Sequence, residues 1–208
     1  MDSTAHPPDP PGPPGAVPGL PPPLAGGGDR FERWAAEARV EEAARARARE
    51  GWLRRQAEES ATLAGVVADL QERGVPVTVH TRAGGRHTGA VRAVGADVVV
   101  VRTAPGAGPG GDVLVPLAAL TAVRAGPGTG PAVGDRRPGA GPTFTDLLVD
   151  LAADRAAVRV ATVGGDAVAG VLRAVGRDVL VVTPASGGTA HVALGAVAEV
   201  AVEPPAPG

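Results

Sequence analysis

The chain has 208 residues, and its 31 glycines and 22 prolines make up about a quarter of it, a share that borders on low complexity. The formal net charge is only −2 at pH 7, which gives no overall attraction to nucleic acid or anionic lipid. With 2% aromatic residues and no cysteine, the composition excludes disulfides, thiolate chemistry and a large enzyme domain, and favours small β-rich units built on Val, Leu and Ala.

The first 28 residues are rich in proline and glycine, and only Asp2 and Asp9 are charged. Such a segment cannot bury enough apolar surface to offset its chain entropy, so residues 1–28 are predicted to be a disordered tail, as are residues 203–208. The chain does not begin with a secretory pattern, and no run of 18 apolar residues occurs. We therefore expect a cytoplasmic protein without a membrane-spanning segment.

A long charged helix is predicted next, over residues 29–61. Asp29 is a suitable N-cap, and no proline follows before Arg73, while Ala, Glu and Arg dominate. Whether one helix continues to residue 73 is left open, and Gly51 is the expected break or kink. Trp34, Trp52 and Leu53 are the candidate partner-binding residues of this helix, which would dock on a folded unit or on a second copy.

An internal repeat is the strongest signal in the chain. Thr62–Val101 aligns without gaps on Thr143–Val182, and after a loop four residues shorter Val115–Val123 aligns on Val192–Val200. Each copy begins with a short amphipathic helix and continues with alternating strand-like segments separated by glycine turns.

The repeat predicts an α+β protein with two tandem small antiparallel barrels, each preceded by a helix. The first occupies residues 62–124 and the second residues 143–202. Residues 125–142 are rich in glycine and proline and are predicted to be a flexible linker.

Several segments of both copies are similar to the Sm-like fold, a small SH3-type barrel. In the first copy they are Val77–Thr81, Gly89–Asp97, Val98–Val101 and Val115–Leu120; in the second they are Val158–Thr162, Gly170–Asp178 and Val192–Val197. The whole arrangement also resembles a group of actinobacterial proteins, which implies a fold but no activity. The Sm-like resemblance implies RNA binding through loop residues, although the typical Asn after the loop Asp and the typical Arg-Gly pair are absent here.

The first predicted hairpin carries the candidate nucleic-acid-binding residues. His80 and His87 flank it, and Arg82 and Arg86 lie between them, so we expect the four side chains to form a compact cationic tip. The second copy has Val163-Gly164-Gly165-Asp166 at this place. The alternative is a solvated hairpin, because single-strand readers usually add stacking aromatics and this hairpin has none.

No set of residues suggests catalysis. The serines have no nucleophile motif around them, and we expect no catalytic residues, no cofactor and no metal site. The repeated Asp97 and Asp178 each follow a glycine turn, where aspartate typically bonds to nearby backbone.

Two functions remain open for a non-enzymatic protein. One is a regulatory protein that binds RNA or DNA through the hairpin tip. The other is a protein-interaction or scaffold module that uses the long helix and the barrel edges and binds no nucleic acid. The fold resemblance slightly favours the first.

Overall fold

The computed structural model describes residues 27–104, 110–136 and 141–204. The chain divides into two compact units, residues 1–50 and 51–208. The described part of the first unit belongs to one long helix, and the second unit holds the end of that helix and all strands. Most of the predicted tail 1–28 and the end of the predicted tail 203–208 lie outside the described residues.

The long helix α1 (Gly27–Glu59) has 33 residues, and nearly all of its side chains are exposed. Gly51 lies within α1, which continues through it without the break that the sequence suggested. The helix ends at residue 59 instead of continuing to 73, because Thr62 starts a new helix by accepting a hydrogen bond from the backbone N–H of Gly65.

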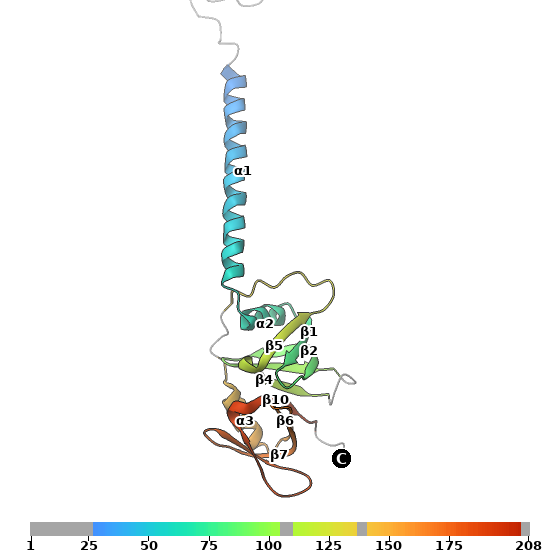
Figure 1. Ribbon diagram of the computed structural model, residues 1–208. Coiled ribbons are helices and arrows are strands. Elements are labelled where there is room, and N and C mark those ends of the chain that lie inside the picture. Colours follow the sequence, from blue (N-terminus) through green and yellow to red (C-terminus); the bar gives the residue numbers. More distant parts are fainter. Residues whose placement is uncertain (1–26, 105–109, 137–140, 205–208) are drawn as a thin grey trace, which may run out of the picture. The chain divides into compact units, whose positions relative to one another are not determined.

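The two aligned copies form equivalent sets of elements, named here the first repeat and the second repeat (Figure 1). The first contains α2 (Leu63–Glu72), β1 (Pro76–Thr81), β2 (Arg86–Val94), β3 (Val98–Thr103), β4 (Asp112–Pro116), the 3-10 helix η1 (Leu117–Ala119) and β5 (Leu120–Ala125). The second contains α3 (Phe144–Ala153), β6 (Ala157–Thr162), β7 (Ala167–Val175), β8 (Val179–Thr183), β9 (Ala190–Ala193), the 3-10 helix η2 (Leu194–Ala196) and β10 (Val197–Val202). The predicted α+β class and the internal repeat are therefore confirmed.

The ten strands formed by the described residues belong to one antiparallel sheet in the order β5-β1-β2-β3-β4-β10-β6-β7-β8-β9. Within each repeat the fifth strand returns to pair with the first, but the sheet does not close into a barrel. Instead β4 of the first repeat pairs with β10 of the second, with Leu114 opposite Val200 and Val113 opposite Ala201. The repeats thus share one sheet, whereas the sequence predicted two separate barrels.

The burial of β3 explains why the sheet continues across the repeats. All four valines of Val98–Val101 are buried, so this strand is covered on both faces. Val99 and Val101 pack in the core of the first repeat, while Val98 and Val100 pack in the core of the second. In the equivalent strand β8, alternate residues are only half buried, because the described chain has no third repeat to cover them.

A helix cap reinforces this junction. The Asp97 carboxylate accepts a hydrogen bond of 2.6 Å from the backbone N–H of Phe144, the first residue of α3. A carboxylate at a helix N-terminus is favourable because it satisfies a free N–H and opposes the helix dipole. Asp97 was expected to bond to its own turn, and this contact with the other repeat corrects that expectation.

Much of the predicted flexible linker packs on α2. The Arg73 guanidinium donates to the carbonyl oxygens of Gly130 and Pro131, and Arg136 forms an ion pair with Glu72. Gly65 leaves room for this segment, since a Cβ there would lie 2.1 Å from the carbonyl oxygen of Gly134. Residues 126–136 are therefore held by specific contacts rather than free, and residues 137–140 lie outside the described residues.

None of the described helices is both long and apolar enough to cross a membrane.

Leu114 and His191 provide a matched test of the junction, because they occupy equivalent positions in β4 and β9. Leu114 is 4% exposed, whereas His191 is exposed at the sheet edge. We expect Leu114→Asp to lower the free energy of unfolding by about 3 kcal/mol or more, since it buries an unpaired charge between two cores. His191→Asp should change it by less than about 0.5 kcal/mol. Urea unfolding followed by circular dichroism measures both, and equal effects would contradict the junction.

Candidate nucleic-acid interface

The register of the hairpin β1–β2 decides which side chains share a face. Val79 lies opposite His87, and His80 lies opposite Arg86. Directly opposed residues point to the same side of a sheet, and neighbours along a strand point to opposite sides. His80 and Arg86 are therefore together on one side, while His87 is on the other side with the buried Val79.

His87 contacts the second repeat. Its Nε2 lies 2.9 Å from Oε2 of Glu199 in β10, and the Thr81 hydroxyl donates to the same oxygen at 2.6 Å. The side chains of His87 and Glu199 are only 16% and 13% exposed. Gly85 makes this approach possible, because a Cβ there would lie 2.1 Å from Glu199 Oε2. We name Thr81, His87 and Glu199 the interrepeat clamp.

The interrepeat clamp keeps Glu199 ionised. Burial alone works to raise the pKa of this carboxyl group, but the hydrogen bonds from His87 and Thr81 favour the charged form, and the pKa is lowered overall. In the second repeat, Val168 occupies the position equivalent to His87. In the first repeat, Ala122 occupies the position equivalent to Glu199. The polar contact is therefore specific to the junction between the repeats.

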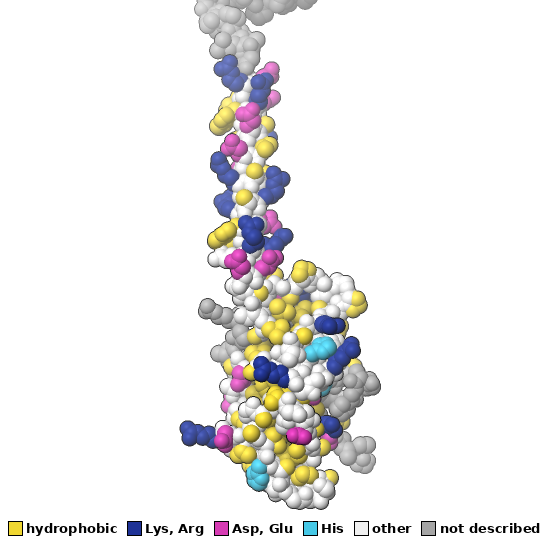
Figure 2. Space-filling model, viewed as in Figure 1, with side chains coloured by type: hydrophobic (Ala, Val, Ile, Leu, Met, Phe, Trp, Pro, Cys, Tyr) yellow, Lys and Arg dark blue, Asp and Glu magenta, His cyan; other side chains and the backbone are white. Residues whose placement is uncertain are grey.

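Three cationic or titratable side chains share the outer side of β5, β1 and β2. His80 lies between Arg86 of β2 and Ala122 of β5, and Arg124 is opposite Thr78 two pairs further along, on the same side of the sheet. Both arginines are exposed, whereas the His80 Nε2 is buried without a hydrogen-bond partner. We name His80, Arg86 and Arg124 the cationic face, and Figure 2 shows arginine and histidine side chains close together over this region.

Arg82 is exposed at the end of the same hairpin. Its backbone N–H donates to the carbonyl oxygen of Ala119, and its side chain borders a shallow hollow that Asp97 and Phe144 also line. The structure therefore places Arg82 at the end of the hairpin, next to a hollow that residues of both repeats line. The expected compact tip of four side chains does not form, because His87 is turned into the interrepeat clamp.

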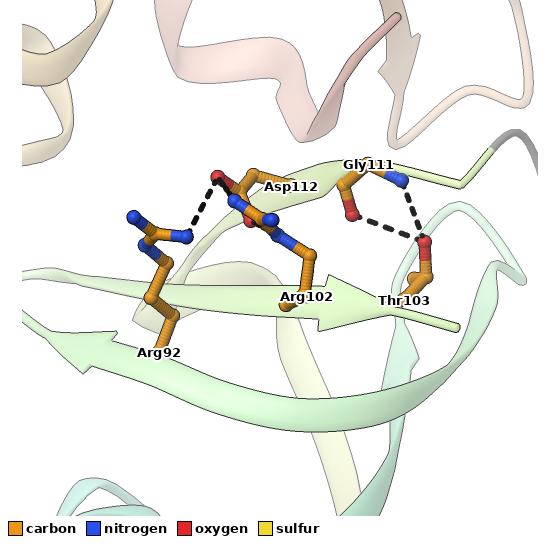
Figure 3. A network of polar contacts seen from close by, with 5 residues as sticks. All are labelled: Arg92, Arg102, Thr103, Gly111 and Asp112. Carbon is orange, nitrogen blue, oxygen red and sulfur yellow. Dashed lines mark hydrogen bonds and ion pairs between the residues drawn. The ribbon is translucent and has the colours of Figure 1, made fainter. Parts of the chain in front are cut away.

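Other arginines of the first repeat are neutralised. The Arg102 guanidinium donates to both Asp112 oxygens, at 2.5 and 2.8 Å, and Arg92 lies 4.0 Å from the same carboxylate (Figure 3). The hydrogen bond from Arg102 is the largest cause of the lowered pKa of Asp112. By contrast, Arg82, Arg86 and Arg124 form no ion pair with any described residue.

Sequence reasoning missed Arg124. It was not linked to the hairpin because it lies in β5, far along the chain, and only the pairing of β5 with β1 brings it to His80 and Arg86. The repeat offered a signal, since a fifth strand that returns to the first strand would place Arg124 and the hairpin on one sheet.

The three candidate partner-binding residues of the long helix are exposed on α1. The exposed fractions are 63% for Trp34, 55% for Trp52 and 57% for Leu53. Trp34 contacts the ring of Phe31, with the ring centroids 5.9 Å apart, and Phe31 is itself 67% exposed.

A groove of about 310 Å³ lies between the repeats, beside the Arg102–Asp112 pair. Apolar side chains of β3, β4 and α3 line it, together with Arg92, Asp112, Asp150 and Asp154. Among the described residues, no group of three or more His, Cys, Asp or Glu side chains could hold a metal ion.

Comparisons with protein families, with curated proteins and with solved structures found no match to this chain. The arrangement of its own residues is therefore the basis for assigning a function.

The lowered pKa of Glu199 predicts a specific dependence of stability on pH. The unfolded value is about 4.3, so the ionised carboxylate stabilises the folded state above that pH, and the contribution is lost as the pH falls through the lower folded value. We expect Glu199→Gln to lower the free energy of unfolding at pH 7 by about 1–3 kcal/mol and to lose less stability than wild type between pH 6 and 3. Urea unfolding at several pH values measures this.

The control for this experiment is Glu203→Gln, because Glu203 is exposed just after β10. It should keep the wild-type dependence on pH. If Glu199→Gln also keeps it, the interrepeat clamp does not hold a stabilising charge.

Proposed function

We propose that this protein is a non-enzymatic regulatory protein that binds the phosphate backbone of RNA or DNA through the cationic face, with Arg82 of the same hairpin as a further contact. The observation that carries the proposal is the charge of this surface. β1, β2, β5 and the turn at residues 82–85 contain no aspartate or glutamate, and Arg82, Arg86 and Arg124 form no ion pair with any described residue. Unpaired guanidinium groups are favourable contacts for phosphate oxygens.

The same strands contain no Phe, Trp or Tyr. Single-strand readers usually stack bases on aromatic rings, and contacts to phosphates alone carry no sequence information. The proposed binding is therefore independent of base sequence and depends strongly on salt, since it rests on a few charges on a chain that is negative overall.

The proposed fold relationship is that each repeat is a Sm-like unit. It is supported by the leading helix, the four consecutive strands, the short 3-10 turn and the fifth strand that returns to the first. A cytoplasmic location remains a prediction from the sequence.

The test is fluorescence anisotropy of labelled single-stranded RNA and duplex DNA, titrated with the full chain at low and near-physiological salt. We expect wild type to bind both, more weakly as salt rises. Arg86→Ala/Arg124→Ala should weaken binding and reduce the slope of log K against log salt on duplex DNA by about 2.

Arg173→Ala/Arg177→Ala is the matched control, because it removes the same charge from exposed positions of the second repeat. It should bind as wild type does. Equal losses in the two double variants, or no binding by wild type at low salt, would overturn the proposal.

A second candidate function is a protein-interaction module, and the exposure of large apolar side chains on α1 favours it. Phe31, Trp34, Val40, Trp52 and Leu53 are each more than half exposed. Helices in proteins gain most of their stability from packing an apolar face, so these exposed side chains favour association through α1.

A further inference from the structure

The face of α1 that carries its tryptophans has a symmetrical pattern of residues. Trp52 lies 18 positions after Trp34, which is about five turns of an α-helix, so both point to the same side. Between them this side carries Ala38, Glu41, Arg45 and Ala48 at helical spacing. Ala38, Glu41, Arg45 and Ala48 also line one shallow hollow on the helix, and Figure 2 shows hydrophobic side chains on one side of α1 near both of its ends.

We propose that this face of α1 binds the same face of a second copy of the chain, with the two helices antiparallel. The inference rests on the second candidate function, the interaction role of α1, and names its partner. It is independent of the cationic face. The proposal rests on the complementarity between this face and the same face of a second helix that runs in the opposite direction.

The reversed fit places unlike charges and matching sizes together. With the helices centred on residue 43, Trp34 of one copy faces Trp52 of the other, and Ala38 faces Ala48. At the centre, Glu41 of each copy faces Arg45 of the other. These two residues already form an exposed ion pair of 3.0 Å within one helix, so the centre becomes a cluster of two acids and two arginines.

A parallel arrangement in register has the opposite effect. Each residue then faces itself, so that Glu41 meets Glu41 and Arg45 meets Arg45 at the centre of the contact. Like charges placed opposite each other disfavour a coiled pair of helices. The small alanines next to the centre allow the two backbones to approach closely, which strengthens the repulsion between these charges. The charge pattern therefore selects the antiparallel arrangement.

Cysteine cross-linking tests the orientation, because the natural chain contains no cysteine. Full-length Ala38→Cys and Ala48→Cys variants are mixed, treated with a short thiol cross-linker and analysed by mass spectrometry. We expect 38–48 products to dominate, since residues 38 of two antiparallel copies are about 15 Å apart along the axis. Ala43→Cys, on the opposite side of α1, gives the background. Dominant 38–38 products would overturn the antiparallel arrangement.

Sedimentation equilibrium of the full chain tests the contact residues. We expect a concentration-dependent dimer whose dissociation constant rises about tenfold or more in Trp34→Ala and in Trp52→Ala. Val40→Ala is the control, because Val40 is 66% exposed but lies about a third of a turn away from the tryptophans. It should change the constant less than threefold.

Charge reversal separates pairing from helix stability. Arg45→Glu should weaken the dimer, and Glu41→Arg/Arg45→Glu should restore it, with far-UV circular dichroism confirming equal helix content. A monomer at every concentration, or no restoration, overturns the self-pairing. If the dimer survives both tryptophan replacements, the interaction role of α1 itself is overturned. If the tryptophan replacements weaken the dimer but its cross-links join residue 38 to residue 38, only the antiparallel orientation is overturned.

Discussion

The pairing of β4 with β10 is the constraint on which the rest of the globular part depends. It joins the fourth strand of one repeat to the fifth strand of the other and so makes one sheet from two copies. Its consequence is that Val98, Val100 and Leu114 of the first repeat complete the core of the second. Neither repeat therefore buries its own apolar residues alone, and hydrophobic burial scales with the area that the two repeats cover together.

Polar contacts give this junction its specificity. The interrepeat clamp and the cap from Asp97 to Phe144 both cross between the repeats. Backbone pairing alone tolerates slippage, whereas the largely buried carboxylate of Glu199, which needs His87 and Thr81, is satisfied in one register only. The same clamp turns His87 away from the outer surface, which leaves His80, Arg86 and Arg124 as the basic group on that side of the sheet.

Local chemistry in the sequence explains what could be predicted. The repeat, the short helices that open each copy and the period-two strands all depend on neighbouring residues, and the elements follow them. The joining of the repeats could not be predicted from neighbouring residues, because a run such as Val98–Val101 is equally suited to the core of a barrel or to a strand that is buried on both faces. The candidate site was only partly visible for the same reason: His80 and Arg86 are hairpin neighbours, but the partner of His87 is Glu199 in the last strand.

The order of the strands along the chain has a consequence for synthesis. β10 is the last of the described strands, yet it fills the edge that β4 presents much earlier in the chain. While a ribosome is still making the second repeat, the first repeat has an open strand edge and an uncovered row of Val98, Val100 and Leu114. Such edges are sites of wrong pairing, and domains that emerge first usually fold first. The nascent first repeat is thus the stage at which this chain is most exposed to aggregation, and it ends only when residues up to Val202 have emerged.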